Sequence, residues 1–322
     1  MFNIVNPNVN INFTGKRNLW FAISLATVVG SLVLFFTKGL NYGIDFTGGA
    51  EVQVTLPSDW DLARVRKSMT DAGLGSVGVR SMGQENQNDY MIRLPGTEEE
   101  LNKITTQVAG VFQKELNVSS SESFLLKSDI VGPAAGSTLR KNGILAFFYV
   151  MLAILIYLAF RFDSRYAPGA VVALMHDAII VLGVFILLGK EFDLSILASI
   201  LALMGYSLND TIVVYDRVRE VQELHPEYEV EKAVNLAMNE TLSRTIMTGL
   251  TTLFVVFTLW MWGGAVIENF AFALLIGIIV GTYSSIFIAS SLLITLTRYW
   301  HNKEIKRKKK GTSSSSFLSP SA

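Results

Sequence analysis

The chain contains no cysteine and only three histidines among its 322 residues, and only 17% of it is charged. Without cysteine it cannot form disulfides, thiol nucleophiles or cysteine-bound zinc sites, and His176, His225 and His301 are too dispersed in sequence for a metal-binding motif. The 27 basic and 27 acidic side chains cancel, which removes a general electrostatic attraction to nucleic acid. A mean hydropathy of +0.40 instead indicates a membrane protein, with no sign of a metal or other cofactor.

Six segments are long and apolar enough to cross a hydrocarbon core, which takes about 20 helical residues. They are residues 19–37, 143–160, 167–189, 193–214, 245–262 and 270–297. We therefore predict a polytopic α-helical membrane protein with six transmembrane helices.

Lysine and arginine residues predict the orientation of these spans. Fifteen of them fall on the side of the two termini, whereas the opposite short loops hold only Lys190. Both termini are therefore expected in the cytoplasm. That side would comprise residues 1–18, the turn after residue 160, a loop at 215–244 and the tail 298–322. We interpret the basic run 306–310 as a topology anchor that touches anionic lipid, followed by a disordered Ser-rich end.

The segment 38–141 has the charge density of a soluble domain, and the topology puts it outside the cytoplasm. Its hydrophobic pattern predicts a strand at 51–56, a helix at 58–72, strands at 75–82 and 89–94, a helix at 98–116 and a strand at 121–130. This order predicts a ferredoxin-like βαββαβ sandwich. No catalytic set of side chains is evident in it, so a binding or mechanical role is favoured.

Ionisable residues inside a bilayer are costly and are therefore functional candidates. Asp210, with Asn209 beside it, lies toward the cytoplasmic end of the fourth span, and Arg244 opens the fifth span. By depth these two charges could pair. The alternatives are that Asp210 is hydrated at the interface and that Arg244 is a snorkelling anchor. The many threonines after Arg244, Thr248 among them, favour a functional polar site over a lipid-facing surface.

A second ionisable pair, His176 and Asp177, falls close to the middle of the third span. A structural hydrogen bond to a neighbouring helix and a part in proton transfer explain it equally well. Asp177 and Asp210 together also suggest an intramembrane aspartic protease, but the G-x-G-D context typical of such enzymes is missing.

The sixth predicted span carries small residues at strict four-residue spacing. This stripe consists of Ala273, Gly277, Gly281, Ser285 and Ala289. Such a face lets another helix approach closely. The neighbouring helix belongs either to the same bundle or to a partner subunit, and the sequence favours neither.

Four stretches of the chain resemble motifs of the SecF family of bacterial protein-export subunits. Residues 41–49 read NYGIDFTGG and include Asp45, Gly48 and Gly49. The other three are residues 204–219, 239–252 and 281–287, in the same order and on the same six-span plan.

The resemblance implies an RND-type bundle of six helices in the bacterial inner membrane, and a SecD partner of the same design. It further implies association with the SecYEG channel and YajC, and use of the proton-motive force to draw exported polypeptide outward after SecA has acted. The family's proton path would fall on Asp210, Arg244 and Thr248, with Asn209 in the same motif, and the glycine pair at 48–49 would join the outer domain to the bundle. Sodium in place of protons stays open, as do two other roles: half of a drug or lipid exporter, and a passive assembly subunit.

The basic-residue asymmetry gives a topological prediction. A reporter fused after Ser128 should read as exterior and one fused after Glu231 as cytoplasmic, because the positive-inside rule places the basic loops in the cytoplasm. A pair of reporters active only outside and only inside the cytoplasm would measure this, and the reverse result would refute the orientation.

Overall fold

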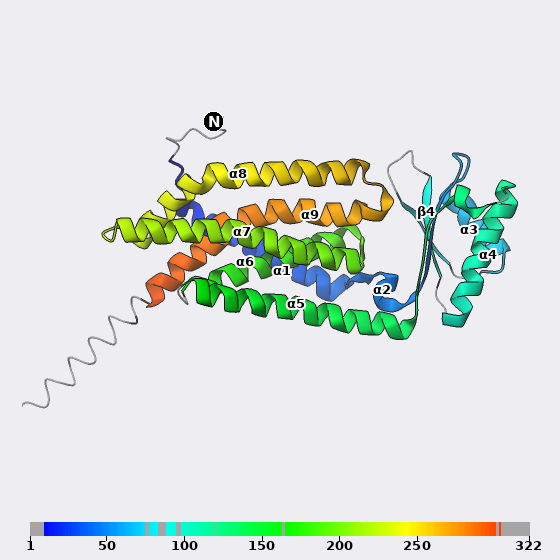
Figure 1. Cartoon of the computed structure of the whole chain (residues 1–322), viewed down its shortest axis with the longest axis horizontal. Helices are drawn as coiled ribbons and strands as arrows, with labels where there is room; N and C mark the ends of the chain where they lie inside the picture. The colour runs from blue at the N-terminus through cyan, green and yellow to red at the C-terminus, as the bar shows by residue number, and fades with distance from the viewer. Residues whose placement is uncertain are drawn as a thin grey trace, which may run out of the picture.

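The computed structural model describes residues 10–74, 77–82, 88–94, 98–118, 120–162, 165–300 and 303. Within these residues, six helices are long and apolar enough to span a membrane. They form an elongated bundle with a small α+β domain at one end (Figure 1). The helices are α1 (Arg17–Lys38), α5 (Pro133–Arg161), α6 (Ala167–Leu188), α7 (Leu194–Leu224), α8 (Val230–Trp262) and α9 (Ala265–Ser284). A π-helical turn, η3 (Ser285–Ala289), continues α9, and the span runs on to Trp300.

Each predicted span overlaps one of these helices, but the loop predicted at 215–244 is wrong. Helix α7 continues to Leu224 and α8 begins at Val230, so most of that loop is helical. Hydropathy detects only the apolar part of a helix, whereas these polar turns are held by ion pairs. Arg217 contacts Glu220 at 2.5 Å on its own helix and Glu240 at 2.6 Å on α8.

The start of the predicted tail at residue 298 is also corrected, because the last helix reaches Trp300. The basic run 306–310 and the Ser-rich end lie outside the described residues, so the expected anchor and disorder remain predictions.

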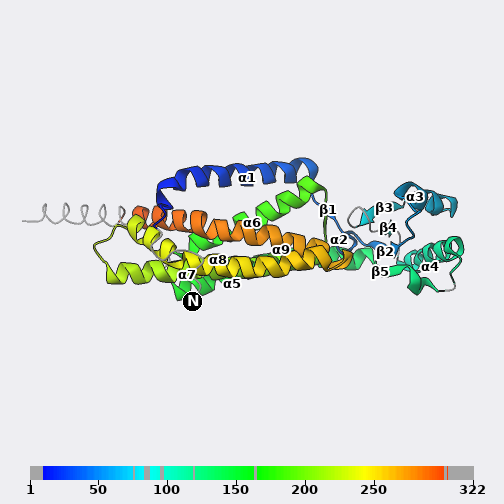
Figure 2. The ribbon, with the colours of Figure 1, turned by 90° about the horizontal axis from the view of Figure 1, so that it is seen from above.

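Helix α9 lies at the centre of the bundle, packed against α7 and α8, while α1 lies against α6 (Figure 2). The small-residue stripe of α9 faces α7 and is buried. A Cβ atom at Gly277 would collide with the Leu203 side chain, and one at Gly281 would lie 3.0 Å from the Cβ of Ser207. The stripe therefore serves packing within the bundle, which decides between the two alternatives that the sequence left open.

The α+β domain has the predicted βαββαβ order. Its elements are β2 (Gly49–Thr55), α3 (Leu62–Asp71), β3 (Gly78–Met82), β4 (Asp89–Leu94), α4 (Glu98–Leu116) and β5 (Leu125–Val131). The antiparallel sheet has the strand order β3-β4-β2-β5, as the ferredoxin-like prediction requires. The helices cover the face that is remote from the bundle, so the other face of the sheet looks toward the membrane helices (Figure 1).

Several boundaries of this domain differ from the prediction: the first helix begins at Leu62 instead of residue 58, and the second strand begins at Gly78 instead of residue 75. The last strand begins at Leu125 because the 3₁₀ turn η2 (Ser121–Ser123) precedes it. The domain ends before residue 141, because Pro133 already starts α5, where a proline fits the first helical turn without loss of a hydrogen bond.

Packing at the glycine stripe predicts the effect of a larger side chain. Gly281→Leu should lower the free energy of unfolding by about 1–3 kcal/mol, because the new side chain must displace Ser207 on α7. Thermal unfolding of the purified chain in detergent would measure the loss. Gly30→Leu on α1 is the matched control, since nothing lies within 4 Å of that Cβ position. Equal melting temperatures for both variants would contradict this packing.

Candidate functional site

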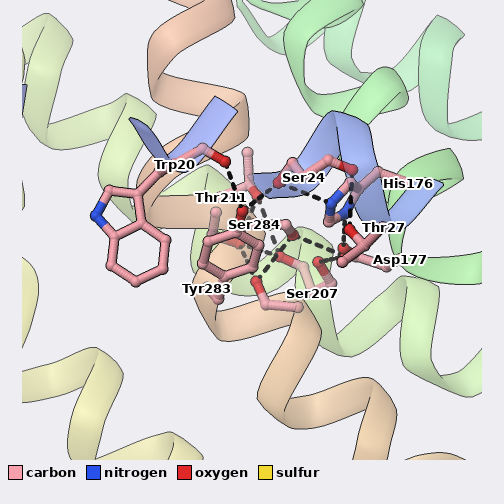
Figure 3. A network of polar contacts seen from close by, with 11 residues as sticks. Trp20, Ser24, Thr27, His176, Asp177, Ser207, Thr211, Tyr283 and Ser284 are labelled. Atoms are coloured by element: carbon pink, nitrogen blue, oxygen red, sulfur yellow. Dashed lines mark hydrogen bonds and ion pairs between the residues drawn. The ribbon is translucent and has the colours of Figure 1, made fainter. Parts of the chain in front are cut away.

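Asp177 lies at the centre of a buried polar network in the bundle (Figure 3). One carboxylate oxygen pairs with His176 Nδ1 at 2.9 Å. The other accepts hydrogen bonds from the hydroxyls of Ser207 on α7, at 2.7 Å, and Ser284 on α9, at 2.9 Å. Both oxygens of this carboxylate are therefore satisfied inside the protein.

The same network reaches the first helix through the other nitrogen of His176. His176 Nε2 lies 3.1 Å from the Ser24 hydroxyl, which also contacts the Tyr283 hydroxyl. Tyr283 in turn donates to the backbone carbonyl of Trp20 at 3.0 Å. Helices α1, α6, α7 and α9 are thus joined by one set of hydrogen bonds (Figure 3). This arrangement favours the structural interpretation of His176 and Asp177.

Asp210 has a different environment, although it lies on α7 less than one turn beyond Ser207. Its side chain is only 3% exposed, and its Oδ2 atom has no hydrogen-bond partner among the described residues. Arg244 and Thr248 of α8 both lie near enough to act electrostatically on its carboxylate. The three residues therefore lie on the facing sides of α7 and α8, but among the described residues Asp210 and Arg244 form no ion pair within 4.0 Å.

The surface beside Asp210 is open. Asn209 and Arg244 are exposed, whereas Thr248 is half-buried. The Thr248 hydroxyl donates to the backbone carbonyls of Arg244 and Thr245, both at 3.1 Å. The exposure of Arg244 suits a snorkelling side chain as well, but a purely peripheral anchor would not act on Asp210.

A tyrosine adds to this site, and sequence reasoning missed it. The Tyr206 hydroxyl is buried and has no hydrogen-bond partner among the described residues, yet it faces the hydroxyls of Thr248, Thr252 and Thr282. Tyr206 precedes Asp210 by four residues, so both lie on one face of α7. That spacing is the signal that could have revealed it. A polar strip therefore runs between α7, α8 and α9.

The π-helical turn of α9 lies next to this strip. The Thr211 hydroxyl is 2.9 Å from that of Ser285, at the start of η3, and Tyr215 donates to the carbonyl of Ala289, at its end, at 3.0 Å. Such π-helical turns often occur at functional sites, because they leave the helix less regularly bonded. Helix α7, which carries Asp210, is therefore bonded to both ends of the π-helical turn, through Thr211 at its start and Tyr215 at its end.

The motif at residues 41–49 lies where the α+β domain meets the bundle. The Asp45 carboxylate, on α2 (Ile44–Thr47), accepts a hydrogen bond from the backbone N–H of Leu194 at 2.9 Å, and Asp193 accepts one from Ile196 at 2.9 Å. Two carboxylates thus cap the N-terminus of α7, where the helix dipole favours negative charge. Strand β1 (Asn41–Tyr42) also pairs in parallel with β6 (Glu191–Phe192), directly before that cap.

Ion pairs connect the sheet to the same point. Arg93 on β4 pairs with Glu191, and Arg80 on β3 contacts the other oxygen of Glu191 at 3.0 Å. Arg93 also lies 3.4 Å from Glu51 on β2. Burial raises the pKa of Glu191 above the ordinary glutamate value, against the effect of both arginines. Its negative charge at this place therefore depends on these two partners.

The glycine pair forms a close-packed joint. Gly48 has a φ of +76° and Gly49 one of +133°, which side chains rarely permit. A Cβ atom at Gly48 would lie 2.6 Å from the Cα of Pro133, the first residue of α5. The two glycines therefore let the chain turn into the sheet while α2 packs directly on α5. We name this region the domain–bundle junction: Asp45, Gly48, Arg93, Glu191 and Asp193.

The fold and these sites define a class of protein. It is a polytopic membrane protein with six helices long enough to span the bilayer, and an aspartate buried beside an arginine in such a bundle marks a candidate functional site because charge is costly there. Among the described residues, no group of three or more histidines and acids could hold a metal ion.

Comparisons with known proteins identify the family. Residues 111–299 match the model of "Protein export membrane protein SecD/SecF, C-terminal", and residues 33–56 match the SecD/SecF GG motif. The chain is 43% identical to the protein translocase subunit SecF of Calditerrivibrio nitroreducens over 90% of this chain and 95% of that one. It is 41% identical to SecF of Pseudomonas aeruginosa over 89% and 91%. The chain belongs to the SecD/SecF family of protein-export membrane proteins.

A solved structure shares the whole architecture. The crystal structure of SecDF from Thermus thermophilus, described as a translocon-associated membrane protein, superimposes with a TM-score of 0.81 at 35% identity. The match covers 92% of this chain but only 40% of SecDF. This chain therefore corresponds to one part of that longer protein. The six-helix fold class predicted from the sequence is confirmed.

The contrast between the two aspartates gives a prediction. Asp177→Ala should lower the free energy of unfolding by about 1–3 kcal/mol for each buried group left without its partner. The groups affected are the Ser207 hydroxyl and Nδ1 of His176, whereas the Ser284 hydroxyl keeps its bond to the Gly281 carbonyl at 3.1 Å. Asp210→Asn should leave the melting temperature of the purified chain nearly unchanged, because Oδ2 of Asp210 has no partner to lose. A larger loss at Asp210 than at Asp177 would contradict this division of roles.

Proposed function

We propose that this chain works as the SecF-type subunit of the Sec protein translocase and couples protein export to the proton gradient. The observation that carries the proposal is Asp210: a buried carboxylate with an unpartnered oxygen, next to a cation on the facing helix, in a member of a protein-export family. An acid in this setting can change its charge without breaking the hydrogen bonds that hold the bundle together.

The proposed mechanism rests on the distance between Asp210 and Arg244. Burial penalises an ionised carboxylate, and a nearby guanidinium stabilises it. When α7 and α8 approach, Asp210 is ionised; when they separate, it takes up a proton. Each charge that crosses the membrane supplies about 2.3 kcal/mol per 100 mV, which suffices to shift an equilibrium of a few kcal/mol. Sodium is the competing coupling ion, and replacing it with potassium during the export measurement would distinguish the two.

The proposal also assigns partners and location. A SecD chain would supply the rest of the twelve-helix RND-type unit, in keeping with the 40% of SecDF that this chain matches. The assembly would lie in the bacterial inner membrane with both termini in the cytoplasm, next to the SecYEG channel and YajC. It would act on exported polypeptide after SecA.

The proposed coupling to the outer domain runs along α7. From Asp210 to Leu194, α7 extends for about 24 Å at 1.5 Å per residue. At its far end it is capped by Asp45 and Asp193, and Glu191 is paired to the sheet. A shift of α7 would therefore pull on the α+β domain directly. The joint at Gly48 is packed against α5, so we do not assign free hinge motion to it.

Two other roles use the same fold and predict different outcomes. A passive assembly subunit has no use for an ionisable residue at Asp210, so neutral variants would be fully active. Half of a drug or lipid exporter would change the efflux of small molecules instead of protein export.

The central prediction concerns the charge of Asp210. Asp210→Asn should abolish the part of export that depends on the proton gradient, because the amide keeps the shape but cannot ionise. The ATP-driven part should continue, at normal abundance of the complex. Arg244→Ala should behave likewise, and Arg244→Lys should retain part of the function because it keeps the positive charge. Translocation into membrane vesicles, with and without a gradient, measures both parts.

The matched control is Asp216→Asn, which removes a carboxylate from the same helix where it pairs with Arg161 at 3.0 Å on the surface. It should export normally. Full gradient-dependent export by Asp210→Asn would exclude the proton role.

A separate prediction concerns coupling at the domain–bundle junction. Arg93→Gln and Glu191→Gln should each weaken gradient-dependent export while leaving proton-dependent conductance in place, because they loosen α7 from the sheet without touching Asp210. The double variant should lose less than the sum of the two single changes, because each of them removes the bond between Arg93 and Glu191, while Glu51 and Arg80 are separate partners. Parallel conductance and translocation assays on one vesicle preparation would show this uncoupling.

Arg64→Gln provides the comparison for the junction variants. It breaks an exposed ion pair with Asp59 within the same domain, 2.6 Å long, that does not reach the bundle. Additive losses at Arg93 and Glu191, or an equal loss with Arg64→Gln, would speak against the junction as the coupling element.

A further inference from the structure

An apolar groove opens between the ends of α1 and α5 that are nearest to the α+β domain. It has a volume of about 220 Å³. Its walls come from α1, from α5 and from the short segment that carries β1 and α2, and its floor comes from α6 and α7. The lining residues are Phe35, Leu40, Tyr42, Phe46, Arg140, Gly143, Ile144, Phe147, Leu182, Phe192, Leu197 and Ile200. Among these described residues, Arg140 is the only charged one.

The groove opens on the outer surface of the helical bundle. Phe35 and Ile144, on its two long walls, are 38% and 53% exposed, so it is open sideways between the helices. Apolar cavities of about 150 Å³ in soluble proteins stay dry and accept apolar ligands. In the bilayer an empty groove would forfeit dispersion contacts along its whole lining. The acyl chains of the surrounding lipids are the apolar groups available to fill this groove.

Arg140 stands at the depth of lipid headgroups. The apolar part of α5 begins at residue 143, and Arg140 precedes it by about 4.5 Å at 1.5 Å per residue. On the opposite wall, Lys38 ends α1 at the start of the same interface. The guanidinium of Arg140 lies 5.8 Å from the centre of the Tyr42 ring, which holds it over the groove. Arg140 takes part in none of the ion pairs between described residues, so its charge is available for an anion.

We propose that this groove binds one anionic phospholipid from the leaflet next to the α+β domain. An acyl chain fills the space between α1 and α5, and Arg140 binds the phosphate at the mouth. The apolar groove would hold the acyl chain, and Arg140, one helical turn closer to the α+β domain, would bind the phosphate. The two parts of the site thus follow each other along the membrane normal in the same order as the acyl chain and headgroup of a lipid. The site would also place a lipid against β1 and against α2, which carries Asp45 of the domain–bundle junction.

Electron paramagnetic resonance of spin-labelled lipids tests the site on the full chain in nanodiscs. Phosphatidylglycerol and phosphatidylcholine with identical labelled chains are the two probes, and the fraction of immobilised label is the readout. The native chain should prefer phosphatidylglycerol about fivefold, the scale set by one basic side chain at an anionic lipid surface. Arg140→Gln should remove that preference, and inorganic phosphate should not displace the lipid.

Lys141→Gln is the matched control, because Lys141 adjoins Arg140 in sequence but does not line the groove. It should keep the preference. Ile144→Trp, which fills the mouth, should reduce the immobilised fraction for both lipids. Both glutamine variants alter exposed residues, so they test the site even if the tryptophan variant fails to fold.

Three results would overturn the proposal. They are equal immobilisation of both lipids by the native chain, equal losses in Arg140→Gln and Lys141→Gln, and displacement by inorganic phosphate, which would reveal a bare anion site. Mass spectrometry of the purified chain adds one more: a polypeptide segment retained in the groove in place of lipid would assign it to a protein partner.

Discussion

The hydrogen bonds that converge on Asp177 are the interaction on which the bundle depends. A carboxylate inside a membrane has no water to accept donors from, so the protein must supply them or suffer the cost of burial. Here the donors come from α7 and α9, and His176 extends the contact to Ser24 on α1. Any large shift of one of these helices would leave a buried polar group unpaired. The network therefore fixes the relative positions of four helices.

Helix α7 connects the Asp177 network to the Asp210 site, in which one carboxylate oxygen has no hydrogen-bond partner among the described residues. Ser207 is committed to Asp177, and Thr211 to Ser285 in the π-helical turn. Asp210 lies between these two anchors in sequence but keeps an unpartnered oxygen. These hydrogen bonds do not involve Asp210, so a change in its charge would act instead between α7 and Arg244 and Thr248 of α8. Since Asp45 of the motif at residues 41–49 caps α7, the proposed coupling would run along this helix from Asp210 toward the α+β domain.

The sequence predicted those features that follow from periodicity and composition. Six spans, their order and the βαββαβ domain came from patterns that local residues determine. The loop at 215–244 was wrong because ion pairs across α7 and α8, such as Arg217 with Glu240, support helix where hydropathy is low. The partner of the small-residue stripe stayed ambiguous. Small residues indicate that another helix approaches closely, but they do not indicate whether that helix belongs to the same bundle or to a partner subunit.

The site residues also divide into those that the sequence could identify and those that only the fold reveals. Asp210 and Arg244 stand out in sequence because charge is rare in apolar spans. The role of Asp45 as a cap of α7 could not be predicted, because its partner Leu194 lies 149 residues away and only the fold brings them together. His176 and Asp177 were open to two interpretations, since the hydroxyl groups that favour a structural role come from other helices. Sequence patterns thus identify unusual residues, whereas the role of each one depends on contacts that only the fold brings together.

The open side of the Asp210 site has its own physical consequence. Asn209 and Arg244 are exposed on the isolated chain, beside a buried acid. Polar side chains at this depth are stable against hydrocarbon only where water, headgroups or another protein surface meets them. Headgroups can serve Arg244, at the edge of the apolar part of α8, but they do not reach the unpartnered oxygen of Asp210. A second helical chain that packs on this face would close the site from the side, and SecDF, of which this chain matches 40%, is long enough to contain one. Such a chain would cover Asn209 and Arg244, whereas the unpartnered oxygen of Asp210 is already buried within this chain.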